Sequence, residues 1–380
     1  MRQRLRGSRV LRAIRFLPYL IPYTIWRLLT RVRPDRILFL SDSHDGFTGN
    51  MAFLRDAIER RHPDAEIIGV FKPGLAARRP FGDVVRLPHL LATSAVIVLD
   101  DFYPLIYNAR IRPGARLVQI WHAAGAFKQV GHSRAGLPGG PTRGSEIHRN
   151  YTDAIVSSEG VVGDYAEAFG IPRERVHAWG MPRSDVFFDE ALIEDTRSRV
   201  RSRLGVEEED TFVVYAPTFR GNGQLTAQAA PDADWAGIAE ELGAGWRIGV
   251  RQHPFVAKGA LPPGVVDAAT VADMNDVLIA ADVLVTDYSS AIFEFALLRR
   301  PIVFFVPDLD EYAEARSFYR PFQDYAVGPV VTDAAGLTDA IRDARVDDAR
   351  LDAFLAEFCG ALDGRSSDRI SDELVRGGRA

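Results

Sequence analysis

The sequence predicts an α/β protein made of two doubly wound parallel-sheet domains. At 380 residues the chain is about two to three times the usual single-domain length, which favours two domains. Short apolar runs rich in β-branched residues alternate with helical patterns, and such runs are typical of strands buried on both faces of a parallel sheet. A charged, helix-like stretch without a strand signal, residues 189–209, separates two series of these runs.

The two series of predicted strands define the domains. The first series comprises residues 36–41, 66–71, 95–99, 116–121 and 154–157, and the second comprises residues 211–215, 246–250, 282–286 and 301–306. We therefore expect an N-terminal α/β domain over residues 37–190 and a C-terminal α/β domain over residues 191–380 with a helical tail. Ligands of such domains bind at the carboxyl ends of the strands, so we expect the site there, in a cleft that the two domains face.

Composition excludes several classes of protein. With 47% hydrophobic and 26% charged residues the chain is ordinary for a globular protein, which argues against a disordered, collagen-like or multispan membrane protein. The single cysteine, Cys359, can form neither an internal disulfide nor a zinc site of the CxxC type. Its isolation suits a reducing cytosolic environment.

The first 36 residues form a separate, basic feature. They hold ten arginines and one acidic residue, whereas the whole chain carries a formal net charge of −5. The apolar run over residues 16–26 contains Pro18 and Pro22 and is shorter than the roughly 20 residues that span a bilayer. No signal-peptide cleavage pattern follows this run, so export is not expected.

Apolar residues recur at helical spacing in this basic segment. They are Leu17, Leu20, Ile21, Ile25, Leu28 and Leu29, with arginines on either side. The pattern predicts an amphipathic element on an anionic membrane surface. One alternative is a basic helix docked on the protein's own surface. Nucleic-acid binding is disfavoured because the rest of the chain is acidic and shows no nucleic-acid-binding motif.

Two histidines directly follow predicted strands, where the active sites of α/β proteins lie. His122 follows residues 117–121, and His253 follows residues 248–252 and precedes Pro254. Because the ordinary pKa of imidazole is near 6.5, either histidine is a candidate general acid or base at neutral pH. A purely structural role is the alternative for each.

Two further segments predict sites for an anion. In residues 282–296 a buried strand leads through a polar turn into a helix that starts at Ser289 or Ser290, where backbone N–H groups and hydroxyls favour a nucleotide diphosphate. The alternative is a plain helix cap. In residues 215–220 a strand ends in Pro217, Thr218 and Arg220, and the arginine is suited to pair with phosphate.

Five ordered motifs together resemble the CDP-glycerol glycerophosphotransferase family, the teichoic-acid primases and polymerases. The motifs are Trp121-His-Ala-Ala-Gly-Ala-Phe-Lys128 with Gly131, Gly180-Met-Pro-Arg-Ser-Asp185, Tyr215-Ala-Pro-Thr-Phe-Arg220, Arg251-Gln-His-Pro254 and Thr286-Asp-Tyr-Ser-Ser290. The resemblance covers about residues 115–330. It implies a two-domain, GT-B-like fold.

The resemblance also implies an activity. We expect transfer of glycerol phosphate from CDP-glycerol, or from a related CDP-alditol, to a polyprenyl-linked or glycan hydroxyl, with release of CMP, in the synthesis of a teichoic-acid-like cell-wall polymer. It implies a cytoplasmic enzyme, peripheral at the inner face of the cell membrane, without a cofactor or metal. Phosphoryl transfer needs alignment and charge stabilisation more than covalent chemistry, which agrees with this expectation.

Carried over motif by motif, the resemblance assigns roles to particular residues. His122 and His253 become the catalytic histidines, with their division of roles open. The expected donor-binding residues are Ala123, Gly125, Arg183, Pro217, Thr218, Arg220, Arg251, Ser289, Ser290 and Glu294. The expected acceptor-side residues are His44, Lys128 and Arg134.

Four points stay open. Ala123 replaces a glycine of the family pattern and Lys128 lies one residue further from the histidine, which bears on the choice of alditol, with CDP-ribitol as the alternative donor. The chain is also expected to lack further domains of the long polymerases, which favours a primase-like role. Asp100 and Asp101 suggest either a metal site or a helix cap. A GT-B glycosyltransferase using a nucleotide sugar and a non-enzymatic nucleotide-binding subunit are the competing functions.

Overall fold

The computed structural model describes residues 9–72, 77, 79–221, 226–257 and 259–378. The chain divides into two compact units. Unit 1 comprises residues 1–122, 142–183 and 361–380, and unit 2 comprises residues 123–141 and 184–360. The units therefore differ from the two expected domains in three segments, because residues 123–141 and 184–190 belong to unit 2 and residues 361–380 belong to unit 1.

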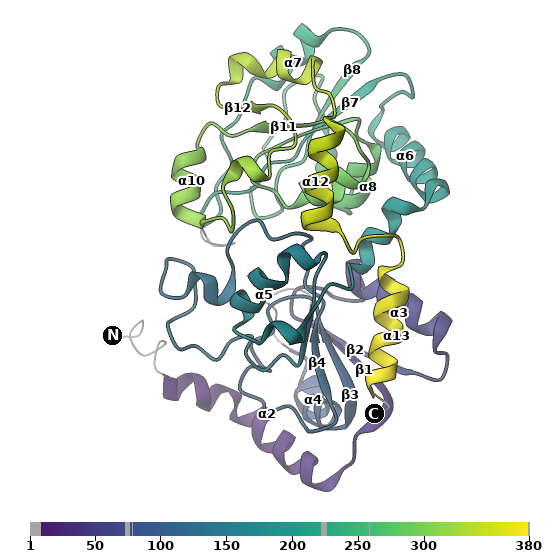
Figure 1. The fold of residues 1–380 in the computed structure, drawn as a ribbon, viewed down its shortest axis with the longest axis vertical. Coiled ribbons are helices and arrows are strands. Elements are labelled where there is room, and N and C mark those ends of the chain that lie inside the picture. The colour runs from purple at the N-terminus through teal and green to yellow at the C-terminus, as the bar shows by residue number, and fades with distance from the viewer. Residues whose placement is uncertain (1–8, 73–76, 78, 222–225, 258, 379–380) are drawn as a thin grey trace. The chain divides into compact units, whose positions relative to one another are not determined.

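Unit 1 contains a six-stranded parallel sheet in the order β2-β1-β3-β4-β5-β6. Its strands are β1 (Arg33–Ser41), β2 (Glu66–Phe71), β3 (Ser94–Leu99), β4 (Arg116–Gln119), β5 (Asp153–Ile155) and β6 (Val176–His177). Its helices are α2 (Arg9–Leu29), α3 (Gly49–Arg61), α4 (Phe81–Thr93), α5 (Val162–Phe169) and α13 (Ser366–Gly378). The C-terminal helix α13 lies beside α3 and covers β1 and β3 (Figure 1).

Unit 2 contains a second six-stranded parallel sheet in the order β12-β11-β10-β7-β8-β9. Its strands are β7 (Thr211–Tyr215), β8 (Trp246–Val250), β9 (Val266–Asp267), β10 (Val283–Thr286), β11 (Ile302–Phe305) and β12 (Val330–Val331). Its helices are α6 (Glu190–Leu204), α7 (Trp235–Leu242), α8 (Met274–Ala280), α9 (Ala291–Leu297), α10 (Leu309–Arg316), α11 (Leu337–Arg342) and α12 (Asp348–Cys359).

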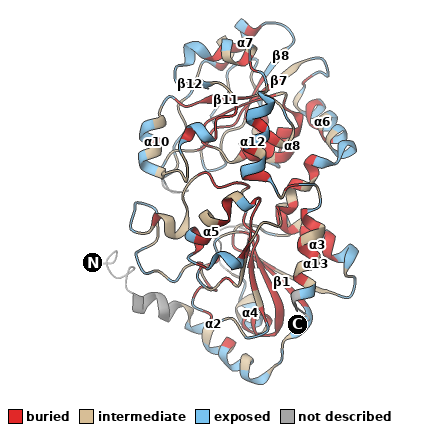
Figure 2. Cartoon of the chain, viewed as in Figure 1, coloured by how far each residue is buried: buried red, intermediate tan, exposed pale blue. Residues whose placement is uncertain are grey.

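The central strands of each sheet are buried on both faces, which explains their continuous apolar runs in the sequence. Every residue of β3 and the last six residues of β1 are buried, as the buried strands in Figure 2 show. All four residues of β10 and of β11 are buried in unit 2. The predicted fold class, α/β with two parallel sheets, is confirmed.

Residues 9–29 of the basic N-terminal segment form α2, which continues through Pro18 and Pro22. Tyr23 is buried on its inner side and its hydroxyl donates to the Arg110 carbonyl (2.9 Å). The ring of Trp26 meets His89 of α4 edge to face. No helix among the residues placed by the structure is long and apolar enough to cross a membrane. Arg2, Arg4 and Arg6 of the predicted segment lie outside the described residues.

Candidate active site

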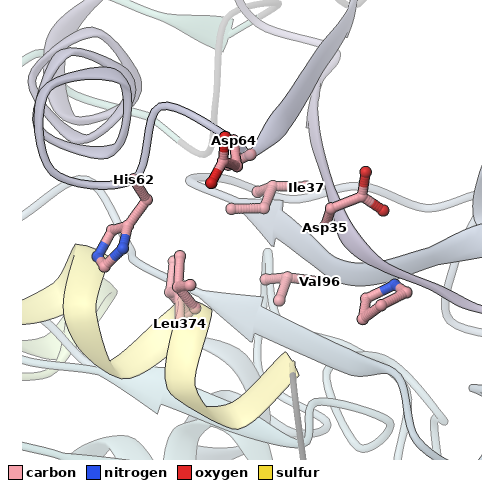
Figure 3. A pocket seen from close by; sticks show the side chains of 9 residues that line it. Asp35, Ile37, His62, Asp64, Val96 and Leu374 are labelled. Carbon is pink, nitrogen blue, oxygen red and sulfur yellow. The ribbon is translucent and has the colours of Figure 1, made fainter.

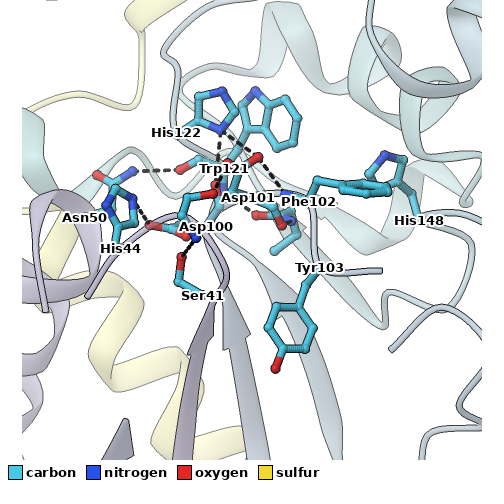
Figure 4. A network of polar contacts seen from close by, with 12 residues as sticks. Ser41, His44, Asn50, Asp100, Asp101, Phe102, Tyr103, Trp121, His122 and His148 are labelled. Carbon is cyan, nitrogen blue, oxygen red and sulfur yellow. Dashed lines mark hydrogen bonds and ion pairs between the residues drawn. The ribbon is translucent and has the colours of Figure 1, made fainter. Parts of the chain in front are cut away.

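His122 lies three residues beyond the end of β4, at the carboxyl edge of the first sheet (Figure 4). Its Nδ1 lies 3.2 Å from the main-chain oxygen of Asp100 and 3.8 Å from Oδ1 of Asp101. Because a carbonyl oxygen can only accept, Nδ1 carries the proton, and the lone pair of the neutral ring is left on Nε2. The side chain is 48% exposed, so His122 can accept a proton at Nε2.

His44 lies close to His122 in unit 1, at the carboxyl end of β1. Its Nε2 is 3.4 Å from Oδ2 of Asp100, and this interaction raises the pKa of His44 above its ordinary value while burial opposes the rise. The other carboxylate oxygen of Asp100 is buried without a hydrogen-bond partner. The acceptor-side candidate His44 and the candidate base His122 therefore both lie against the segment that contains Asp100 and Asp101.

Arg183 also belongs to unit 1, in the 3₁₀ turn Pro182–Phe188. Its main-chain N–H donates to Oδ1 of Asn50 (3.0 Å), and the other end of the Asn50 carboxamide donates to the Trp121 carbonyl (2.7 Å). The segments that carry Arg183 and His122 are therefore joined through one side chain. Sequence analysis did not single out Asn50.

His253 lies three residues beyond the end of β8 in unit 2, packed among the rings of Phe219 and Phe255. The main-chain N–H of Phe255 donates to its Nδ1 (3.2 Å), so the neutral ring carries its proton on Nε2. Burial, with the nearby charge of Lys128, lowers the pKa of His253 to about 4. At neutral pH this imidazole is uncharged and donates from Nε2, the opposite tautomer to that of His122.

Lys128 is grouped by the fold with His253 in unit 2, although sequence analysis expected it on the acceptor side. Its ammonium lies 5.6 Å from the centre of the Tyr312 ring. Burial lowers the pKa of Lys128 to about 7; Asp287 opposes this fall, whereas Arg316 and Arg220 contribute to it. A lysine with this pKa is charged in only part of the molecules at neutral pH and gains a proton readily when an anion binds.

Arg220 is held by two carboxylates in unit 2. Its Nε and one terminal nitrogen donate to Asp308 (2.6 and 3.0 Å), and the other terminal nitrogen donates to Asp287 (2.8 Å). Asp287 also accepts from the main-chain N–H of Thr218 (2.8 Å), whose buried hydroxyl has no hydrogen-bond partner. Arg220 therefore braces the loops after β7 and β10, and Thr218 offers an unused hydroxyl there.

Two other predicted arginines bind main-chain carbonyls. Arg251 donates to the carbonyls of Ala268, Val271 and Ala272, and burial lowers its pKa. Arg134 donates to the carbonyls of Pro138, Ala315 and Arg316, all within unit 2, and burial lowers its pKa as well. These contacts close loops in unit 2. The structure thus places Arg134, expected on the acceptor side, in unit 2.

The remaining predicted donor residues also lie in unit 2. Ser290 precedes α9 as its cap, Ser289 accepts from the Ala291 N–H (3.3 Å), and Glu294 is buried within α9. Gly125 adopts φ +62°, and a Cβ there would fall 2.3 Å from the Phe293 ring, so only glycine fits. Pro217 is buried and Ala123 half-buried. The rings of Tyr288 and Tyr312 stack with their centres 3.9 Å apart, and both residues are buried.

A pocket at the opposite edge of the first sheet is distinct from this region. It is lined by residues at the start of β1 and by His62 and Leu374 (Figure 3), whereas His122 lies beyond the carboxyl end of β4. Within the described ranges no group of three or more His, Cys, Asp or Glu side chains could hold a metal ion. Oδ2 of Asp100 lies 3.4 Å from Nε2 of His44, and the Asp101 carboxylate accepts from the Ser43 hydroxyl (2.8 Å) and from the Phe102 N–H (2.6 Å).

The two parallel sheets and their connections define a GT-B-like α/β class. A solved structure of the wall teichoic acid polymerase TagF, in a variant that replaces a histidine by alanine, superposes with a TM-score of 0.77 at 21% identity and covers 97% of each chain. This similarity shows the shared fold.

The chain belongs to the CDP-glycerol:poly(glycerophosphate) glycerophosphotransferase family, whose model matches residues 22–376. It is 37% identical to a teichoic acid poly(ribitol-phosphate) polymerase of Bacillus spizizenii, over 97% of this chain and 60% of that protein. It is 38% identical to the teichoic acid ribitol-phosphate polymerase TarK of Staphylococcus aureus, over 93% and 71% respectively. A teichoic acid ribitol-phosphate primase of Bacillus spizizenii is 31% identical, over 92% and 94%.

Proposed function

We propose that this protein transfers an alditol phosphate from a CDP-alditol to a lipid- or glycan-linked hydroxyl, with release of CMP. The family and the complementary protonation of two histidines support this activity. His122 presents a bare Nε2 at the end of β4, and His253 presents a protonated Nε2 at the end of β8. One histidine is thus prepared to accept a proton and the other to donate a hydrogen bond.

In the proposed reaction the acceptor hydroxyl attacks the phosphorus that carries the alditol. Nε2 of His122 takes the hydroxyl proton while the new P–O bond forms and the P–O bond to CMP breaks. The carbonyl of Asp100 and the carboxylate of Asp101 stabilise the imidazolium that results. No covalent intermediate on the enzyme is needed.

Unit 2 supplies the stabilisation of negative charge in this proposal. His253 donates from Nε2 to a phosphate oxygen, and Lys128 and the hydroxyl of Thr218 contribute charge and a hydrogen bond. We propose Arg220 and Arg251 as residues that hold the donor loops, because the contacts of their guanidinium groups lie within the protein. With these groups supplying charge, we propose that transfer needs no divalent metal, so that EDTA leaves CMP release unchanged.

The alditol is proposed to be ribitol, with glycerol as the second candidate. The sequence motifs alone favoured CDP-glycerol. The relatives named for ribitol phosphate are 31–38% identical, whereas a glycerol-phosphate primase of Bacillus spizizenii and a poly(glycerol phosphate) polymerase of Bacillus subtilis are 26% and 30% identical. The higher identity supports ribitol.

Calorimetric titration with CDP-ribitol, CDP-glycerol, CDP and UDP-glucose tests the donor class. We expect each CDP-alditol to bind more tightly than CDP and UDP-glucose. Of the two CDP-alditols, CDP-ribitol should bind more tightly than CDP-glycerol. A preference for UDP-glucose would overturn the phosphotransferase proposal in favour of a glycosyltransferase. A preference for CDP-glycerol would retain the activity and replace the alditol.

We further propose that α2 lies on an anionic membrane surface, at the inner face of the cytoplasmic membrane. Its outer side exposes Leu17, Ile21, Ile25, Leu28 and Leu29, with exposed fractions of 42–83%. Helix α4, which packs against α2, adds exposed Phe81 (81%) and Val85 (60%). Arg27 and Arg31 provide the positive charge that anionic lipids attract.

Sedimentation with lipid vesicles tests this proposal. We expect the protein to bind vesicles that contain phosphatidylglycerol and to bind neutral vesicles much less. Replacing Leu28 and Leu29 by serine should reduce binding strongly, whereas Leu192→Ser, which changes an exposed leucine on α6, should not. Equal binding by both variants would contradict a role for α2.

A further inference from the structure

The main chain immediately before His122 is strained. Trp121 has φ +48°, in the left-handed region that side chains with a Cβ rarely adopt. Its indole is buried against Tyr165 and Phe169. A strained conformation persists only where the surroundings hold it, so specific contacts must fix this peptide.

Two buried side chains hold the two peptide groups of Trp121. Oε1 of Gln119 accepts from the Trp121 N–H (2.9 Å), and Nδ2 of Asn50 donates to the Trp121 carbonyl (2.7 Å), as Figure 4 shows for Asn50. Asn50 is 3% exposed and Gln119 is fully buried. The carbonyl that Asn50 holds belongs to the peptide bond that leads into His122.

The second end of each carboxamide reaches another segment of unit 1. Nε2 of Gln119 donates to the Asp101 carbonyl (3.2 Å) and to the hydroxyl of Tyr151 (3.0 Å). Oδ1 of Asn50 accepts from the N–H of Arg183 (3.0 Å). Each amide therefore uses both its donor and its acceptor, which fixes its orientation. Gln119 ties Trp121 to the strand end that carries the partners of His122, and Asn50 ties it to the segment of Arg183.

We infer that Asn50 and Gln119 are positioning residues that hold the strained Trp121 peptide. In this arrangement Nδ1 of His122 donates to the Asp100 carbonyl and Nε2 stays unprotonated. The inference rests on the proposed function for its catalytic consequence, since it assumes that His122 is the base. The part of the inference that concerns structure, namely the tautomer and orientation of His122, does not depend on whether His122 is the base.

Asn50→Asp is the sharpest variant. It keeps the size of the side chain and the acceptor for the Arg183 N–H, but it sets a carboxylate oxygen against the Trp121 carbonyl. We expect kcat to fall by at least about tenfold with KM for the donor changed less than about threefold, because geometry at the base changes and donor binding does not. Gln119→Met, which removes the acceptor for the Trp121 N–H, should act in the same direction.

The matched control is Asn150→Asp. Asn150 lies in the same unit, and its Nδ2 donates to the carbonyls of Ile106 and Ala109, so the substitution removes the same kind of bond away from Trp121. We expect Asn150→Asp to keep a near-normal kcat when its thermal stability equals that of Asn50→Asp. An equal loss of kcat in the control would overturn the positioning role.

Nitrogen NMR of histidine-labelled protein separates this inference from the proposed function. The wild-type His122 signal is expected to report the Nδ1–H tautomer, and Asn50→Asp and Gln119→Met are expected to shift it toward a mixture. In the double variant with His122→Ala, Asn50→Asp should cause no further loss of turnover. An unchanged tautomer in both folded variants would overturn the inference, whereas full turnover by His122→Ala would overturn only the catalytic assignment.

Discussion

At the scale of single residues, protonation distinguishes the two histidines and the lysine of the site. The partners of the imidazole rings place the proton on Nδ1 of His122 and on Nε2 of His253. Lys128 lies near His253, and the charged groups that act on it are Asp287, Arg220 and Arg316. Each imidazole thus enters the proposed reaction in the tautomer that its hydrogen-bond partners select.

The pKa of Lys128 predicts how donor binding depends on pH. Below about pH 7 its ammonium is charged and attracts a diphosphate, and above that pH the group must gain a proton when the donor binds. We expect calorimetry at pH 8.5 to show weaker binding than at pH 6, with proton uptake that depends on the buffer. Lys128→Met should abolish the uptake and weaken binding by about tenfold at pH 6.

Lys72→Met is the matched control for this experiment, since Lys72 is a buried lysine of unit 1 that faces Asp42. Its replacement should leave the proton uptake in place. Retention of full uptake by Lys128→Met would show that another group takes the proton.

At the scale of elements, arginines join the loops that follow the strands. Arg220 connects the loop after β7 to Asp287 after β10 and to Asp308 before α10, and the hydroxyl of Tyr288 also donates to Asp308 (3.0 Å). Because these carboxylates are at most 18% exposed, removing the arginine leaves two buried charges uncompensated. The loops that carry Thr218 and Ser289 depend on this bridge.

Arg220→Met should therefore destabilise the protein by about 3–5 kcal/mol in urea unfolding. Arg299→Met is the control, because Arg299 also binds two carboxylates, Asp348 and Asp352, but all three side chains are 44–77% exposed. Its cost should be about 1 kcal/mol or less. Equal costs for the two variants would contradict the bridging role of Arg220.

At the scale of the whole molecule, the end of the chain completes the first unit. Helix α13 returns to unit 1 and packs its buried Ile370 and Leu374 against the core that contains β1 and β3. Unit 1 therefore includes residues from both ends of the chain, and we expect α13 to contribute to its stability.

Ile370→Ala and Leu374→Ala should each cost about 2–5 kcal/mol, because each removes a fully buried side chain. Hydrogen exchange should become faster in β1 and β3 and remain unchanged in β10 and β11. Arg376→Ala, an exposed change on the same helix, should have little effect. Slow exchange in β1 of the two core variants would argue against this role for α13.

Local sequence patterns predicted most of the sheets, because strands buried on both faces are apolar throughout. The run 66–71 coincides with β2, and runs 211–215 and 246–250 coincide with β7 and β8. The two-residue strands β6, β9 and β12 are too short to produce such a run. The assignment of residues 123–141 and 361–380 to their units arises from packing over long sequence separations, which no local pattern contains.

The candidate residues at the strand ends could also be predicted from the sequence, whereas the residues that support them could not. His122 and His253 stand out because each follows an apolar run. Asn50 acts on Trp121, 71 residues away, and nothing in its own neighbourhood indicates that contact. Gln119 did carry a signal, because it is the one buried polar residue of β4 and has to find hydrogen-bond partners.

The central claim is that this protein releases CMP from a CDP-alditol by a reaction that uses both His122 and His253. The most direct measurement is CMP formation from CDP-ribitol and from CDP-glycerol with a hydroxyl acceptor, by the wild type and by His122→Ala, His253→Ala and His62→Ala. His62 serves as the control, since it binds Asp372 at the opposite edge of the first sheet. We predict that the first two variants lose at least about a hundredfold in rate and that His62→Ala retains the wild-type rate. Wild-type rates in His122→Ala and His253→Ala would contradict the account.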